Sequence, residues 1–304
     1  MASIQTVLGP VDSSRLGVCL PHEHVFLNLM SEHGPDGRLN DLHLMTEELA
    51  RFHALGGGAL VELTSIGLGR EPVMLRQVAS ATGLHIIMGT GYYRDPYLEH
   101  TELDAEGTNA CADRLIGEVR DGIDGTDIHP GIIGEIGSGR TISPREERSL
   151  RAAARAHLAT GLTISTHAAG WPVGLEQLNL LAEEGVTAGR VIIGHADTVP
   201  STDYHEAIAA RGAYVEFDNL QGVTEYDTQT VIRFILTLRS LGHLDRILLS
   251  HDICLRSQLS IYGGPAYSFL LKDFVPRLLA AGLSTREIEI LTVENPAAAI
   301  SGER

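Results

Sequence analysis

The chain has 304 residues, of which 43% are hydrophobic and 20% charged, and its formal net charge is −16. This composition is typical of a globular protein, no apolar run is long enough to span a membrane, and the strong negative charge disfavours nucleic-acid or anionic membrane partners. Three widely spaced cysteines indicate a reducing compartment without disulfides. Residues 1–5 lack a signal-peptide pattern, so we expect a cytoplasmic protein.

Residues 1–15 predict a short hairpin or arm, with a turn at Gly9 and Pro10. After this segment, short apolar runs alternate with longer segments of helical periodicity. The predicted strands are residues 17–20, 59–63, 85–88, 131–135, 163–166, 190–193, 213–217 and 246–250. The predicted helices are residues 46–55, 71–82, 110–121, 144–160, 175–184, 203–210 and 228–241. Such alternation predicts parallel strands joined by helical crossovers.

Eight strand–helix units fit a closed (β/α)8 TIM barrel with a short N-terminal hairpin or arm. A doubly wound open sheet is the alternative, but the first strand is not followed by a Gly-x-Gly-x-x-Gly pattern. The chain shows no linker, low-complexity stretch or repeat, so we expect residues 1–304 to form a single domain.

Two histidines, His22 and His24, directly follow the first predicted strand. Alternate residues of a strand share one face, so the two imidazoles should point together while Glu23, between them, points into the barrel wall. A lone His-x-His pair is weak evidence among 14 histidines. It becomes half of a metal site only if further ligands lie nearby.

Further residues of ligand type end four later strands. Glu135 ends the fourth predicted strand, His167 the fifth, His195 the sixth and Asp252 the eighth. Each alone is more often a hydrogen-bonded packing residue, and Glu135 could be a buried ion-pair partner. A barrel brings the carboxyl ends of its strands to one rim, so together they favour a metal centre. Nitrogen and oxygen ligands suit zinc, with manganese or cobalt as alternatives.

The ligand pattern resembles the amidohydrolase superfamily, and five segments resemble its phosphotriesterase-like family over nearly the whole chain. These segments are residues 6–10 (TVLGP), 20–24 (LPHEH), 89–93 (GTGYY), 193–197 (IGHAD) and 294–297 (ENPA). The resemblance implies a (β/α)8 barrel that holds two divalent ions, usually zinc, bridged by a hydroxide. Carried over by position, one ion is held by His22, His24 and Asp252, the other by His167 and His195, and Glu135 bridges them.

Glu135 departs from the better-known members of that family, which bridge the ions with a carboxylated lysine. The only lysine, Lys272, lies far downstream, so the chain resembles the phosphotriesterase-related branch that uses a glutamate. The shorter side chain requires strand four to approach the ions more closely, and assembly should need no carbon dioxide. The departure also disfavours phosphotriesterase activity.

The predicted activity is that of a metal-dependent hydrolase. The bridging hydroxide attacks the carbonyl carbon of an ester or lactone, and Asp252 accepts and passes on the proton. The alternatives are an amidase acting on a small N-acyl compound and an organophosphate hydrolase. A non-enzymatic binding protein is disfavoured because every ligand position carries a competent residue.

Four residues are predicted to bind the small-molecule substrate: Tyr93, Asn219, Arg256 and Tyr262. In the resembled family a tyrosine at the Tyr93 position faces the substrate, although a stacked structural tyrosine is the alternative. Asn219 stands where the lactonases often have an arginine. Arg256 and Tyr262 belong to the segment 253–265, which is long enough to form a lid. Arg256 could neutralise an anionic substrate, and a solvated loop arginine is the alternative. The resemblance further implies a homodimer.

Overall fold

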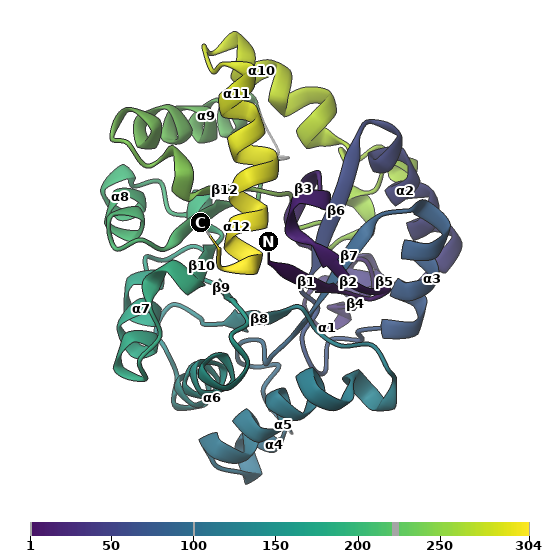
Figure 1. Cartoon of the computed structure of the whole chain (residues 1–304), viewed down its shortest axis with the longest axis vertical. Coiled ribbons are helices and arrows are strands. Elements are labelled where there is room, and N and C mark those ends of the chain that lie inside the picture. The colour runs from purple at the N-terminus through teal and green to yellow at the C-terminus, as the bar shows by residue number, and fades with distance from the viewer. Residues whose placement is uncertain (1, 100, 221–224, 304) are drawn as a thin grey trace.

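The structure is a computed structural model that describes residues 2–99, 101–220 and 225–303. Eight parallel strands form a nearly closed barrel surrounded by helices, which confirms the predicted (β/α)8 TIM barrel (Figure 1). The barrel strands are β3 (Val18–Glu23), β6 (Gly57–Glu62), β7 (His85–Thr90), β8 (Ile132–Gly137), β9 (Ile164–His167), β10 (Val191–Gly194), β11 (Tyr214–Phe217) and β12 (Ile247–Leu249). They neighbour one another in chain order, which excludes the doubly wound sheet.

The helices between the strands match the predicted set. They are α2 (Leu42–Ala54), α3 (Pro72–Thr82), α5 (Thr108–Asp121), α6 (Pro144–Thr160), α7 (Gly174–Glu183), α8 (Thr202–Ala210) and α9 (Glu225–Ser240). Helix α2 begins four residues before the predicted start at Thr46, because Asp41 caps it by accepting a hydrogen bond from Leu44 N at 3.0 Å. Shorter helices are α1 (Met30–His33), α4 (Glu102–Ala105), α10 (Val275–Ala280), α11 (Thr285–Glu289) and α12 (Asn295–Ser301).

The N-terminal hairpin pairs β1 (Ser3–Thr6) with β2 (Gly9–Asp12). Its turn lies at Val7 and Leu8, so the predicted turn at Gly9 and Pro10 is wrong. The Thr6 side chain closes the turn, since its hydroxyl donates to Gly9 O at 2.6 Å and accepts from Leu8 N at 3.2 Å. A second small hairpin pairs β4 (Leu27–Asn28) with β5 (Arg38–Leu39).

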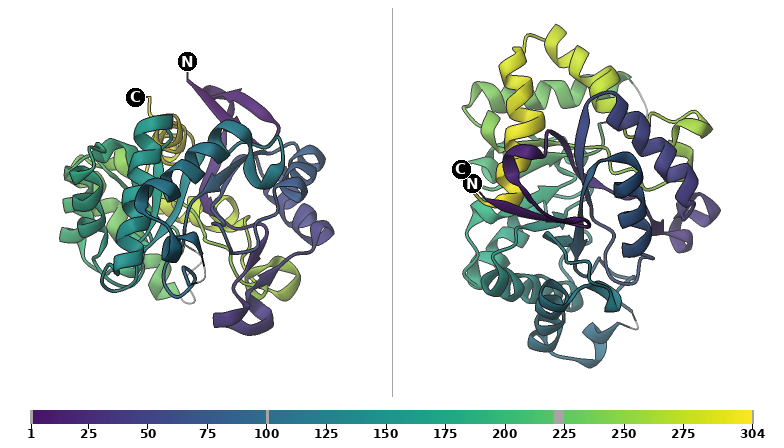
Figure 2. Two further views of the ribbon diagram at one scale, coloured as in Figure 1. Left: turned by 90° about the horizontal axis from the view of Figure 1, so that it is seen from below. Right: turned by 45° about the vertical axis from the view of Figure 1, so that its right-hand side comes forward.

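The hairpin and helix α12 lie at one end of the barrel, as the purple and yellow ribbons of Figure 2 show. Ile4 of the hairpin and Ile300 of α12 belong to the apolar cluster that fills the barrel interior with Cys19, Val61 and Leu248. Apolar side chains therefore fill this end of the barrel. We expect functional groups at the opposite end, where the strands have their carboxyl ends.

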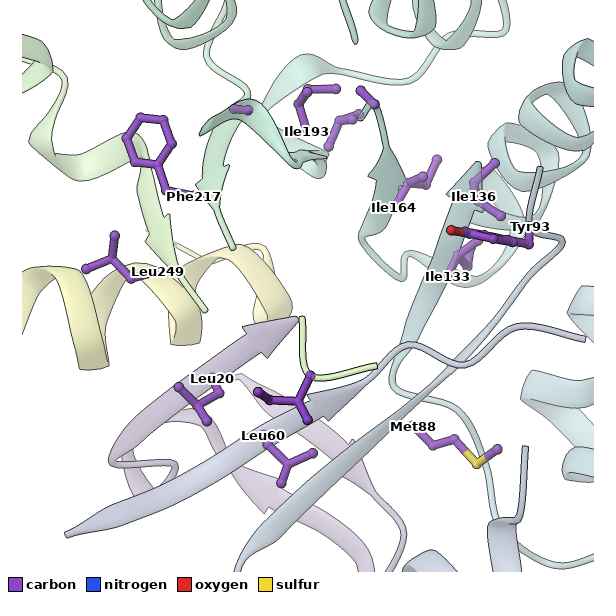
Figure 3. Packing of buried hydrophobic residues seen from close by; sticks show 14 of the residues in the cluster. Leu20, Leu60, Met88, Tyr93, Ile133, Ile136, Ile164, Ile193, Phe217 and Leu249 are labelled. Carbon is purple, nitrogen blue, oxygen red and sulfur yellow. The ribbon is translucent and has the colours of Figure 1, made fainter. Parts of the chain in front are cut away.

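A second apolar cluster separates the strands from the helices. Figure 3 shows strand residues of this cluster, among them Leu20, Leu60 and Ile193. Because both faces of each strand are buried, the strands read as continuous apolar runs, which is why they are easily recognised in the sequence. No helix within the described residues is long and apolar enough to cross a membrane.

Candidate metal centre

The predicted ligands converge at the carboxyl ends of the barrel strands. His22 lies in β3 and His24 follows it, Glu135 lies in β8, His167 ends β9, and His195 and Asp252 follow β10 and β12. The structure brings all six together. Among the groups that could hold a metal ion are His22–His24–Glu135 and Glu135–His167–His195, which share the glutamate.

Glu135 lies between the histidines of the two groups. Its Oε1 atom is 2.7 Å from His167 Nδ1, 3.0 Å from His195 Nε2 and 3.6 Å from His22 Nε2. Its Oε2 atom is 4.0 Å from His24 Nε2. A single carboxylate within reach of four imidazoles is suitably placed to bridge two cations.

The course of β8 brings Glu135 into this position. The pairing of β8 with β9 shifts register between Ile133 and Ile136, and the backbone N–H of Glu135 donates to Leu63 O, beyond the end of β6, at 3.2 Å. Strand β7 lies between β6 and β8, so this contact requires β8 to bend inward over the end of β7. Gly134 permits the bend, because a Cβ atom there would lie 2.6 Å from Ser165 O. This bend brings the side chain of Glu135 within reach of the four histidines.

Asp252 lies on the solvent-facing side of the six candidate ligands, which together form the metal-ligand cluster. Its Oδ1 atom is 3.2 Å from His24 Nε2 and 3.9 Å from His22 Nε2. Its side chain is 18% exposed, against 2% for Glu135. Both Asp252 and His195 have left-handed backbones, with φ of 53° and 56°, which is uncommon outside glycine and often marks functional positions.

Burial and neighbouring charges shift the pKa values of the candidate ligands. Burial opposes ionisation of Glu135, but the neighbouring His167 and His22 outweigh it and hold its pKa well below the ordinary value. Burial, together with the adjacent His195, lowers the pKa of His167. Neighbouring carboxylates outweigh burial and raise the pKa of His22, His24 and His195. Imidazoles bind metals in the neutral form, so a bound ion would displace protons from these histidines, whereas the ionised Glu135 is already in the form that binds metals.

One nitrogen in the cluster has no hydrogen-bond partner. His22 Nε2 is buried and unpaired among the described residues. Leaving a buried polar atom unpaired costs about 1–3 kcal/mol, and a metal ion would remove that cost. This atom, the buried nitrogen and oxygen donors and their spacing all fit a bound divalent ion.

Two buried carboxylates behind the histidines were missed in the sequence. His22 Nδ1 lies 3.0 Å from Asp218 Oδ2 and 3.1 Å from Glu216 Oε2, and His195 Nδ1 lies 2.8 Å from Asp218 Oδ1. Burial raises the pKa of Glu216 to about 7, whereas His195 and His22 outweigh burial and lower that of Asp218. The sequence signal that could have revealed them is the pair Glu216 and Asp218, two acids two residues apart at the end of an otherwise apolar strand.

Glu23 points away from the cluster, as predicted. Its Oε1 atom accepts from Ser250 Oγ at 2.8 Å, His251 N at 3.0 Å and His251 Nδ1 at 2.9 Å, and its Oε2 atom accepts from Ile253 N at 3.0 Å. His251 Nε2 also accepts from Leu270 N at 2.9 Å, so His251 is a packing residue and not a ligand. Glu23 therefore fixes the backbone on both sides of Asp252.

A pocket opens onto the cluster. Beside five of the six candidate ligands, it is lined by Leu27, Leu29, Leu68, Tyr93 and Cys254. The Tyr93 hydroxyl is 3.4 Å from His167 Nδ1, so this predicted substrate residue lies at the site. The lining beyond the ligands is mostly apolar, and this suits an uncharged part of a substrate.

The other three predicted substrate residues do not line this pocket. Asn219 donates through its backbone N–H to Asp197 at 2.8 Å and through Nδ2 to Asp218 at 3.0 Å. Arg256 donates to the Tyr262 hydroxyl at the surface. Their assignment as substrate contacts stays a prediction, and this arrangement does not support it.

The segment 253–265 is tied to neighbouring elements. Ser257 donates to Asp36 through its backbone N–H at 2.8 Å and through Oγ at 2.7 Å. Ser260 Oγ donates to Glu48 Oε1 at 2.6 Å. These contacts hold the predicted lid segment against helix α2 and the segment that precedes β5.

The fold and the site agree with the family to which the sequence can be matched. The profile of the phosphotriesterase family matches residues 2–300. The chain belongs to this family. A phosphotriesterase homology protein from Escherichia coli is 36% identical over 283 residues, which cover 92% of this chain and 96% of that protein.

Other relatives extend the comparison. A crystal structure of a phosphotriesterase homology protein from Escherichia coli, complexed with phosphate in its active site, has a TM-score of 0.91 and 34% identity and covers 94% of this chain and 99% of its own. An N-acetyltaurine hydrolase from Rattus norvegicus is 33% identical over an alignment of 337 positions, which covers 96% of this chain and 96% of that protein. A lactonase from Listeria monocytogenes has a TM-score of 0.93 and 26% identity over 100% of both chains. Members of this metal-dependent family are hydrolases, which supports the same general activity for this chain.

Proposed function

We propose that this chain is a binuclear metal-dependent hydrolase that cleaves an acyl bond in a small molecule. The observation that carries the proposal is the position of Glu135 within reach of four histidines, with Asp252 beside them. One ion is assigned to His22, His24 and Asp252, and the other to His167 and His195, with Glu135 shared. Zinc is the first expectation, and manganese and cobalt are the alternatives.

When bound, the ions supply a water of lowered pKa and polarise the oxygen of the scissile carbonyl group. Asp252 is the most exposed carboxylate of the cluster, so it can accept the proton from the attacking water and deliver it to the leaving group. The hydroxyl of Tyr93 points at the same region of the pocket and can orient a substrate oxygen. Leu27, Leu29 and Leu68 form an apolar wall that excludes water from the acyl group.

The scissile bond is either an ester or an amide. The prediction of an ester or lactone is supported by the 26% identity to the Listeria lactonase. The higher identity of 33% to the N-acetyltaurine hydrolase favours the amide of a small N-acyl compound, and Asn219 in place of an arginine disfavours the lactonase pocket. We therefore rank the N-acyl amide first, the ester or lactone second, and organophosphate hydrolysis as a side activity.

The test is a substrate screen with metal-loaded protein, in which N-acyl amino acids, matched esters, lactones and phosphotriesters are compared at equal concentration. We expect turnover of acyl substrates and a fall in kcat by about 100-fold or more in Asp252→Asn, because a positioned general base contributes on that order. The control is Asp203→Asn, which changes an exposed aspartate in α8 and should keep wild-type kcat.

Unchanged kcat in Asp252→Asn would contradict the assigned role, and turnover of phosphotriesters alone would contradict the acyl specificity. Circular dichroism of both variants separates loss of catalysis from loss of folding. The homodimer and the cytoplasmic location stay predictions. Light scattering on the purified protein tests the homodimer.

A further inference from the structure

Asp218 contacts one histidine from each of the two groups around Glu135. Its Oδ2 atom lies 3.0 Å from His22 Nδ1, and its Oδ1 atom lies 2.8 Å from His195 Nδ1. The backbone N–H of His195 also donates to Oδ2 at 2.9 Å. A carboxylate accepts hydrogen bonds, so both Nδ1 atoms carry the proton, and both Nε2 lone pairs are left to face Glu135.

Glu216 has a narrower set of contacts. Its Oε2 atom lies 3.1 Å from His22 Nδ1, and its Oε1 atom is buried without a hydrogen-bond partner in the described part of the chain. Within the described part of the chain, Glu216 forms a hydrogen bond or ion pair with His22 and not with His195. The two acids of β11 therefore differ in reach, since Glu216 supports one histidine and Asp218 supports two.

Neighbouring residues keep Asp218 in this position. Asn219 Nδ2 donates to its Oδ1 atom at 3.0 Å. Gly194 leaves the space, because a Cβ atom there would lie 3.3 Å from Asp218 Oδ2, 3.4 Å from His22 Cε1 and 2.4 Å from Thr166 O. The fully buried carboxylate thus fits between a glycine and two imidazoles.

We propose that Asp218 couples the two metal sites, acting as a positioning residue for a ligand of each ion, while Glu216 supports only the site that contains His22. The inference rests on the proposed binuclear function. Loss of the partner of a metal-ligating histidine typically weakens metal affinity by about 10-fold to 100-fold. Loss of the Asp218 carboxylate should therefore weaken both ions, and loss of the Glu216 carboxylate only one.

The experiment is a zinc titration of metal-free protein against a chromophoric chelator, which resolves the affinity of each ion. Asp218→Asn should lower both affinities by about 10-fold to 100-fold, and Glu216→Gln should lower one. The matched control is Glu146→Gln, which changes another buried carboxylate; Glu146 accepts from Gly139 N and Ser143 N and contacts no ligand histidine. This control should keep two wild-type affinities.

The outcomes separate this inference from the proposed function. If wild-type protein binds no divalent ion, the proposed function and the inference fall together. If wild-type protein binds two ions and Asp218→Asn leaves either affinity unchanged, only the inference is overturned. Equal weakening of both ions by Glu216→Gln also overturns it.

A second measurement uses the wild-type protein and does not depend on the folding of a variant. Nitrogen-15 NMR of histidine-labelled, zinc-loaded protein reports which ring nitrogen carries the proton. We expect the proton on Nδ1 for His22 and His195, and on Nε2 for His167, whose Nδ1 faces Glu135 at 2.7 Å. A proton on Nε2 of His22 or His195 overturns the proposal.

Discussion

Replacing Glu23 by glutamine should loosen the segment that carries Asp252. Glu23 is fully buried and accepts four hydrogen bonds from Ser250, His251 and Ile253. Glutamine keeps the size of the side chain but replaces one acceptor oxygen by a donor. The least disruptive placement puts the amide nitrogen at the Oε2 position, where it faces the N–H of Ile253.

The magnitude follows from that single conflict. A hydrogen bond to a charged group contributes about 1.5–3 kcal/mol, and a buried donor left unpaired costs about 1–3 kcal/mol. The two terms overlap because both describe the same N–H group, so we expect the free energy of unfolding to fall by about 2–4 kcal/mol. The displaced Asp252 should also lower kcat.

The assay is urea unfolding of the metal-free protein, followed by circular dichroism and by the fluorescence of Trp171, the only tryptophan. The control is Glu47→Gln, whose half-exposed side chain should change the free energy of unfolding by less than about 0.5 kcal/mol. If Glu23→Gln were as stable as this control, the assignment of Glu23 as the clamp of the Asp252 segment would be refuted.

Two further predictions concern the bridge and the response to acid. Metal-free protein reconstituted with zinc in carbon-dioxide-free buffer should regain full activity, because Glu135 needs no carboxylation; a bicarbonate requirement would contradict a glutamate bridge. Burial lowers the pKa of His205, whose Nε2 atom hydrogen-bonds Ala196 O at 2.7 Å, so the fold holds it neutral. The contribution of neutral His205 to the free energy of unfolding is therefore present above the unfolded pKa of about 6.5. It is lost as the pH falls below that value. The free energy of unfolding of His205→Gln should depend less on pH between 7 and 5 than that of wild type, and parallel curves would contradict this.

Much of the fold and the ligand set can be predicted from the sequence for a physical reason. Barrel strands are buried on both faces, so they appear as apolar runs, and their carboxyl ends must meet at one rim. The sequence alone therefore predicts that His22, Glu135 and Asp252 lie close together. That strand four lies closer to the ions than in lysine-bridged relatives stays a prediction.

The features that were missed depend on contacts between distant or unexpected partners. Asp218 and His22 are far apart in the sequence, so no local sequence pattern predicts their contact. The hairpin turn was misplaced because the Thr6 side chain, not a Gly-Pro pair, closes it. The roles given to Arg256 and Tyr262 depended on loop geometry, which periodicity does not determine, and the two side chains contact each other instead.

The most direct test of the central claim is the divalent metal content of wild-type protein purified without chelators. Plasma mass spectrometry should find two ions per chain, with Glu135→Gln retaining fewer than two and showing no measurable acyl hydrolysis. A wild-type protein that carries no ion, takes up none on titration and still hydrolyses acyl substrates would contradict the account.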